Sequence, residues 1–308
     1  MAKTAVLQVM ILFVLILIGY ALTKSGAINE ERKKGISEIL VQVVAPALII
    51  TTLQVKATEE RVSGVLITFA LGIVSYIIFI FLTTLFNKKT DRYDYRTMRF
   101  TMIYQNCGYM GIPFVEGLFG STAVFYMTPL IVLFNAFAFT HGLVLMRNTE
   151  GEKFHLRDFL SPVMISIVLG LVFFFCGIRL PKVLEEPLEM LADLNSPLGM
   201  LLAGTSIAQT DLRHIKNGTV IIKSTLMRLF VLPLIMLAIL IPLPVAPIIK
   251  LTVLTASACP TAALAIIMAI RYDRDEELAA EIFSVTTLLS MVSMPVILTL
   301  AELAGMTV

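Results

Sequence analysis

The stretch QNCGYMGIPFVEGLFG, residues 105–120, decides the fold, because it places helix-disrupting residues inside an apolar segment. Gly108 and Gly111 permit backbone conformations and close approaches that other residues do not. Pro113 has no backbone N–H to lose if it begins a new helix. We therefore predict that a membrane helix stops within this stretch and restarts after Pro113.

The rest of the chain has the composition of a membrane protein. Of its 308 residues, 57% are apolar and only 15% are charged, and the mean hydropathy is +0.89. Apolar runs of about 20 residues, enough to cross roughly 30 Å of hydrocarbon, recur between short charged connectors. Ten such runs predict an all-α polytopic membrane protein, with transmembrane helices at residues 4–22, 36–53, 62–85, 98–119, 124–146, 162–178, 188–208, 229–241, 248–270 and 282–303.

Lysines and arginines indicate the orientation, because they are retained on the cytoplasmic side of short loops. With ten spans the connectors alternate between two sides, and 18 of the 24 basic residues fall on one side, Lys223 and Arg228 among them. We expect a cell-membrane protein with both termini on the non-cytoplasmic side and no basic residue in the interior of any span. Because acidic residues are interleaved with these basic ones, the net charge of +2 does not indicate a nucleic-acid partner.

Motifs for enzymatic chemistry are missing from the sequence. It contains neither a Walker-type GxxxxGK[ST] nor an HExxH. Cys107, Cys176 and Cys259 lie in or beside apolar spans without CxxC spacing, so they predict small buried side chains and no metal site. We therefore expect no enzyme activity and no cofactor, and any energy source must be a gradient or the membrane potential.

The interruption near Pro113 has a counterpart in the second half of the chain. The stretch SACPTAALAIIMA, residues 257–269, again leads small and polar residues into a proline, Pro260, which lies 147 residues after Pro113. Pro46 and Pro197 form a second pair, 151 residues apart. Two halves of five spans, residues 1–150 and 151–308, must enter the membrane from opposite sides, which predicts an inverted repeat. Paired interrupted helices in such halves point to a transporter binding site.

Interrupted helices favour anions at that site. The N–H groups that begin each second half-helix, after Pro113 and Pro260, form positive dipole ends that converge near the bilayer centre. Such ends bind a carboxylate without a buried lysine or arginine. The candidate substrate-binding residues are Gln105, Asn106, Gly108, Gly111, Pro113, Asn135, Ser257, Cys259, Pro260 and Thr261.

Several candidates also have plainer interpretations. Asn106 and Thr261 can simply cap the half-helices, a role compatible with ligand binding. Asn135 suits an interhelical hydrogen bond as well as it suits the cavity. Glu116, one turn beyond Pro113, is a candidate for coupling transport to a cation or proton, although its position at the end of the span favours the outer mouth.

The run NCGYMGIP, residues 106–113, matches the N-x-G-x-x-G-x-P pattern of the auxin efflux carrier family, within the bile acid and auxin transporter group. The resemblance extends over the full chain and includes VAPALI in the second span and CPTAALAIIMA in the ninth. It implies a homodimeric carrier of ten helices with crossed, discontinuous helices 4 and 9. Helices 1, 2, 6 and 7 would form a scaffold, and helices 3–5 and 8–10 a moving transport domain. Bacterial relatives are assigned to organic acids such as malate or malonate, and plant relatives export auxin.

The sequence therefore predicts a secondary carrier for a small organic anion, in particular a carboxylate. It would work by alternating access, with the substrate at the crossover of helices 4 and 9. An anion channel and a ligand-binding receptor on a transporter-like fold remain as alternatives. Saturable flux and counterflow would separate a carrier from a channel, and flux in proteoliposomes would separate both from a receptor.

Overall fold

The computed structural model describes residues 2–87, 94–147, 162–210 and 218–307, and every regular element in these ranges is helical. The expected boundary between the halves, at residues 150 and 151, lies outside the described residues, as do connector residues such as Lys88, Lys153 and Arg213. In chain order the elements, with η marking a π-helical turn, are α1 (Ala2–Lys24), α2 (Glu30–Ile39), η1 (Leu40–Val44), α3 (Ala45–Thr52), α4 (Glu59–Phe86), α5 (Tyr95–Ile103), η2 (Cys107–Gly111), α6 (Ile112–Phe119), α7 (Ser121–Phe137), η3 (Ala138–Gly142), α8 (Leu143–Met146), α9 (Pro162–Cys176), α10 (Lys182–Ala192), α11 (Asn195–Gln209), α12 (Gly218–Leu226), η5 (Met227–Val231), α13 (Leu232–Leu240), α14 (Pro247–Ala258), α15 (Leu264–Arg271) and α16 (Glu276–Leu303).

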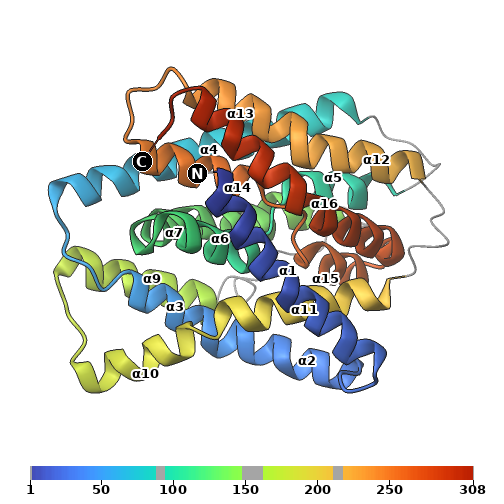
Figure 1. Cartoon of the computed structure of the whole chain (residues 1–308), viewed down its shortest axis with the longest axis horizontal. Coiled ribbons are helices and arrows are strands. Elements are labelled where there is room, and N and C mark those ends of the chain that lie inside the picture. Colours follow the sequence, from blue (N-terminus) through green and yellow to red (C-terminus); the bar gives the residue numbers. More distant parts are fainter. Residues whose placement is uncertain (1, 88–93, 148–161, 211–217, 308) are drawn as a thin grey trace.

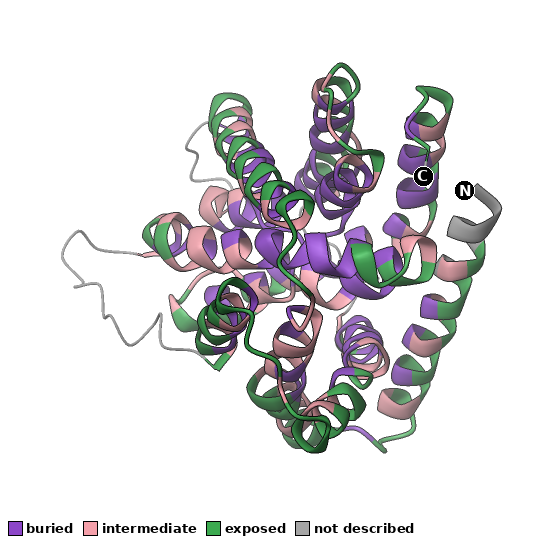
Figure 2. Ribbon diagram, turned by 90° about the vertical axis from the view of Figure 1, so that its left-hand side faces the viewer, coloured by how far each residue is buried: buried purple, intermediate pink, exposed green. Residues whose placement is uncertain are grey.

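Within these ranges, several helical segments are suited to a bilayer. Five are long and apolar enough to cross one, namely Glu30–Thr52, Glu59–Phe86, Ser121–Met146, Gly218–Leu240 and Glu276–Leu303. Shorter apolar helices cover Met10–Lys24, Pro162–Cys176 and Pro247–Ala258. The protein is therefore an all-helical, polytopic membrane protein, as its composition predicts. Figure 2 shows buried residues gathered toward the middle of the helical assembly and exposed ones on its periphery.

Helices far apart in sequence form two groups in space. α1 packs along α11, and α3 packs against α9 and α10, whereas α4 packs on α7, and α13 and α16 pack on α14. In Figure 1 the α2, α3, α9, α10 and α11 ribbons occupy the lower part of the molecule, and α4, α12, α13 and α14 the upper part. Contacts of α1 with α6 and α16 join the two groups.

The contact between α1 and α11 depends on two glycines. A Cβ added to Gly19 would lie 2.2 Å from the carbonyl oxygen of Leu201, and one added to Gly204 would lie 2.0 Å from that of Ile16. Neither distance is possible, so the two backbones approach each other directly, as small residues allow in membrane helices.

Two of the expected spans differ from the observed helices. The span 188–208 is divided, because α10 ends at Ala192 and α11 starts at Asn195 after a short turn. Glutamates at 185, 186 and 189 make α10 too polar to continue the apolar α11 into the bilayer. The span 229–241 is too short, because the helix runs over Gly218–Leu240 and includes Lys223 and Arg228.

Three prolines, Pro113 among them, lie in continuous helical segments that include a π turn. Three π-helical turns, η1, η2 and η5, each end two residues before a proline, at Pro46, Pro113 and Pro233. A proline lacks the N–H of the normal α-helical bond and its ring collides with the carbonyl four residues earlier, which the wider π turn relieves. The prediction that the helix stops within 105–120 and restarts after Pro113 is therefore wrong in position, since η2 and α6 are continuous through Pro113.

The crossover as candidate functional site

In the described part of the chain, two interrupted helices lie with their interruptions against each other. α5 ends at Ile103 and the helix resumes at Cys107, while α14 ends at Ala258 and α15 starts at Leu264. The Asn106 N–H donates to the Pro260 carbonyl oxygen at 2.8 Å, and the Ala262 N–H donates to that of Tyr104 at 2.9 Å. These two bonds form an isolated antiparallel bridge centred on Gln105 and Thr261.

A helix that is interrupted within a membrane exposes backbone groups without hydrogen-bond partners, and the bridge provides such partners. Each interruption supplies donors and acceptors to the other. Pro260, which has no N–H, contributes its carbonyl only. The crossing is thus a structure that neither segment can form alone.

Thr261 closes the bridge on one side. Its hydroxyl donates to the carbonyl oxygen of Thr101 at 2.8 Å, and its N–H donates to Oγ1 of Thr286 on α16 at 3.3 Å. Thr261 is 0% exposed. The hydroxyl and the backbone N–H of Thr261 therefore join the second interruption to α5 and α16.

Arg228 lies directly behind the crossing. Its Nη1 donates to the carbonyl oxygens of Met102 at 3.0 Å and Ile103 at 3.3 Å, and its Nη2 donates to that of Ser257. Its guanidinium lies 5.0 Å from the centroid of the Phe79 ring. The side chain is 0% exposed, so the expectation that no span contains a basic residue, with Arg228 in a connector, is wrong. The sequence itself indicates that Arg228 lies within a span, because apolar residues flank it on both sides.

The other face of the crossing is more open. Asn106 caps η2, since its Oδ1 accepts the N–H of Tyr109 at 3.3 Å, and it is 7% exposed. Its Nδ2 has no hydrogen-bond partner among the described residues. Gly108 is half-buried, and a Cβ built on it would meet nothing within 4 Å. Space therefore exists beside the first turn of η2. The N–H groups of Cys107 and Met110 in this turn bond to the carbonyl oxygens of Gln105 and Asn106.

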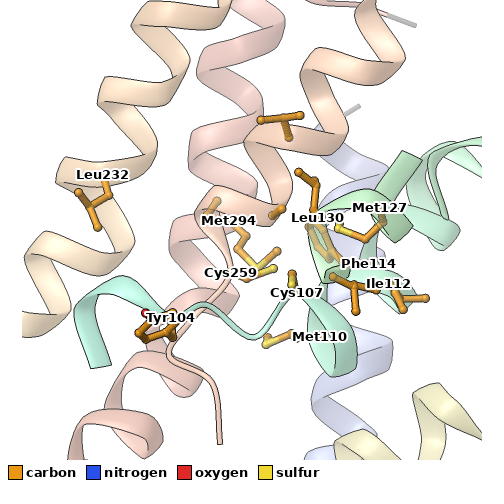
Figure 3. Close-up of a cluster of buried hydrophobic side chains, with 14 of the residues drawn as sticks. Tyr104, Cys107, Met110, Ile112, Phe114, Met127, Leu130, Leu232, Cys259 and Met294 are labelled. Carbon is orange, nitrogen blue, oxygen red and sulfur yellow. The ribbon is translucent and has the colours of Figure 1, made fainter. Parts of the chain in front are cut away.

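One turn later the packing is tight. A Cβ on Gly111 would lie 3.2 Å from Cys259 Sγ, 3.3 Å from Met127 Cε and 3.5 Å from Cys107 Cβ. Figure 3 shows Cys107 and Cys259 beside each other at the crossing, with Met127 close by. Both cysteines are buried and free.

Comparison with known proteins supports the assignment of these helices to a transporter. The family model described as membrane transport protein matches residues 4–155 and 149–298. The chain belongs to the membrane transport protein family. This match confirms the resemblance to the auxin efflux carriers carried by residues 106–113.

Relatives named as transporters align over almost the whole chain. An "Uncharacterized transporter" of Methanothermobacter thermautotrophicus is 27% identical over 296 residues, which cover 93% of this chain and 95% of the relative. A second protein described in the same words, from Methanocaldococcus jannaschii, is 22% identical and covers 92% and 94%. A protein named "Putative malonate transporter" in Rhizobium meliloti is 24% identical and covers 91% and 90%. Membership of this family indicates a transport role and not an enzymatic one.

Within this membrane transport protein, the crossing brings together most of the candidate residues. Gln105, Asn106, Pro260 and Thr261 belong to the bridge itself, and Gly111 and Cys259 pack beside it. Ser257 contributes mainly through its carbonyl, because its hydroxyl donates to Val253 O of its own helix at 2.8 Å.

Three candidates are placed differently. Pro113 is buried in α6, and its carbonyl oxygen accepts a 3.0 Å bond from Nε2 of Gln8 on α1. The Nδ2 of Asn135 donates to Ile131 O at 2.9 Å within its own helix, so this bond is not interhelical. Glu116 is exposed on α6, which favours its interpretation as a residue of the mouth.

Tyr104 is a further crossover residue, which no sequence motif marks. Its hydroxyl lies 2.9 Å from both the Phe137 carbonyl oxygen and Nδ1 of His141, so it ties the first interruption to α7 and η3. Tyr76 packs near it, with ring centroids 6.1 Å apart. No local pattern distinguishes these aromatic residues from ordinary core, because their roles depend on helices that are remote in sequence.

Proposed function

We propose that this protein is a secondary carrier for a small organic anion, in particular a carboxylate, bound at the crossover. The observation that carries the proposal is the bridge between the two interruptions. The bridge pairs Gln105 with Thr261, and the next helices begin close behind these residues. η2 begins two residues after Gln105, and α15 begins three residues after Thr261. The N-terminal ends of helices carry partial positive charge and unpaired N–H groups, and together they favour a carboxylate.

The residues around the open face have complementary roles in this proposal. The Nδ2 of Asn106 donates to the anion, while the Oδ1 of the same amide holds the first turn of η2 in place. Gly108 allows the anion to approach the backbone, because a side chain there would occupy the open space. Gln105, Pro260 and Thr261 position these groups through the bridge.

The proposed carrier has ten transmembrane helices in an inverted five-plus-five repeat, within the cell membrane as a homodimer. α1, α2–α3, α9 and α11 form the scaffold, and α4–α8 and α12–α16 form the transport domain that moves against it to give alternating access. The direct backbone contact at Gly19 and Gly204 supports a rigid scaffold. Both termini lie on the non-cytoplasmic side in this proposal, in agreement with the distribution of lysine and arginine over the connectors.

The first test compares Asn106→Ala with Asn135→Ala in monodisperse protein. Malonate is the first probe, because one relative is named for it. Asn106→Ala is expected to weaken malonate binding by roughly 1–3 kcal/mol, the cost of a lost hydrogen bond to a charged group, with folding largely intact. Asn135→Ala should change affinity little, since its amide is engaged within its own helix.

Binding by calorimetry and initial uptake into proteoliposomes measure these effects. Saturable uptake with counterflow is expected of a carrier, whereas unsaturated flux would indicate a channel and binding without flux a receptor. Unchanged affinity in Asn106→Ala together with a large loss in Asn135→Ala would move the site away from the crossover.

A further inference from the structure

We infer that Arg228 determines the charge selectivity of the crossover site, in addition to joining its two half-helices. This inference rests on the proposed anion site. In this inference, the positive charge that makes the site attract anions belongs to Arg228, which lies behind the crossing and does not contact the ligand.

The geometry places Arg228 at the two helix ends that carry negative charge. Met102 and Ile103 are the last residues of α5, and Ser257 is the second-last residue of α14. The last carbonyls of a helix have no donor within the helix. One guanidinium satisfies carbonyls from both ends, with Nη1 on α5 and Nη2 on α14. The planar fork of arginine suits this task, which a lysine ammonium fulfils less completely.

The charges at the crossing then do not cancel. Each C-terminal end carries about half a negative charge and each N-terminal end about half a positive charge. The two C-terminal ends therefore weaken the preference for anions that the two N-terminal ends give the site. A guanidinium on the two negative ends offsets them and leaves the positive ends of η2 and α15 dominant.

No carboxylate compensates this charge in the part of the chain that the structure describes. The hydrogen bonds of Arg228 all go to backbone carbonyls, and its guanidinium also faces the Phe79 ring. Its Nε–H has no partner among the described residues. A buried, unpaired cation within a membrane helix is costly, and such residues are retained mainly for function.

The test compares Arg228→Gln and Arg228→Lys with a matched control, Arg274→Gln. Arg274 also bonds to backbone carbonyls, with Nε on Met146 O at 2.8 Å and Nη2 on Arg147 O at 2.9 Å, but at the end of α8, outside the crossing. Malonate and the uncharged malonamide are the probes. Binding affinity and the thermal unfolding midpoint are measured on each purified protein.

Arg228→Gln is expected to lower malonate affinity at least about tenfold, because a charge in a low-dielectric region acts over several ångströms. Arg228→Lys should lower the unfolding midpoint, since it replaces fewer bonds, yet keep malonate affinity within about threefold because it keeps the charge. Arg274→Gln should leave malonate affinity unchanged. Wild-type protein should prefer malonate over malonamide, and Arg228→Gln should reduce this preference.

A purely structural role gives a different pattern. If Arg228→Gln keeps its malonate affinity while its unfolding midpoint falls, the inference is overturned. If Arg228→Gln cannot be isolated, Arg228→Lys decides, because a loss of affinity there despite the retained charge also overturns it. A wild-type protein that binds malonate no better than malonamide would instead refute the proposed anion site itself.

Discussion

The two interruptions at the crossover pair with each other but have different sequences. Residues 259–263 contain Pro260 in a run of small residues, and a break there is predictable. Residues 104–106 are Tyr, Gln and Asn, without a proline or glycine. The glycines and proline that suggest a break follow later, in η2 and α6, where the chain is helical. The difference teaches that a proline does not by itself identify a break, since Pro129 and Pro295 also lie inside continuous helices. The first break exists because it pairs with the second.

The largest expected effect separates the two prolines. Pro260→Ala restores an N–H in the second interruption and favours a continuous helix, which would displace the start of α15. We expect initial malonate uptake in proteoliposomes to fall about tenfold or more. Pro113→Ala lies in a continuous helix, and we expect uptake within about threefold of wild type. Equal losses of uptake in the two variants would mean that both prolines define the crossing. This result would contradict the continuous helix observed through Pro113.

An intermediate effect tests the bond that joins the interruption to α5. Thr261→Val removes the hydroxyl donor of the Thr101 carbonyl and should reduce the free energy of unfolding by about 1–3 kcal/mol, the cost of an unsatisfied buried group. Thr255→Val is the matched control, because its hydroxyl bonds to Leu251 O within its own helix at 2.7 Å. This carbonyl keeps its helical donor, so the control should lose under about 1 kcal/mol. Thermal unfolding in detergent compares the two variants. If Thr261→Val is as stable as Thr255→Val, the bond from Thr261 to Thr101 does not stabilise the crossing.

The smallest expected effect distinguishes the open face of η2 from its packed face. Gly111→Ala brings a methyl group against Cys259 and Met127, so neighbours must shift by tenths of an ångström. The net cost should stay under about 1 kcal/mol, because the higher helix propensity of alanine offsets part of this strain. Gly108→Ala meets open space and should not reduce stability, but it should weaken malonate binding by occupying the proposed site. Unfolding midpoints and calorimetric affinities check both. Normal malonate affinity in Gly108→Ala would place the ligand elsewhere.

Much of this protein follows from local properties of its sequence. Apolar runs determine that it is a helical membrane protein, because the backbone must satisfy its own hydrogen bonds in hydrocarbon. The run from Asn106 to Pro113 is sufficient to identify the family, and the small residues around Pro260 are sufficient to locate one interruption. These features depend on neighbouring residues only, so they can be read along the chain.

Only the tertiary structure decided the other break and the groups that stabilise it. Tyr104 bonds to Ala262, and Arg228 bonds to Met102 and Ser257, across sequence separations that no local pattern records. Arg228 resembled a loop residue by charge, and residues 104–106 resembled helix by composition. The structure instead places Arg228 within a helix and an interruption at residues 104–106. The physical reason is that an unpaired backbone group in a membrane needs a hydrogen-bond partner, and here segments remote in sequence supply the partners.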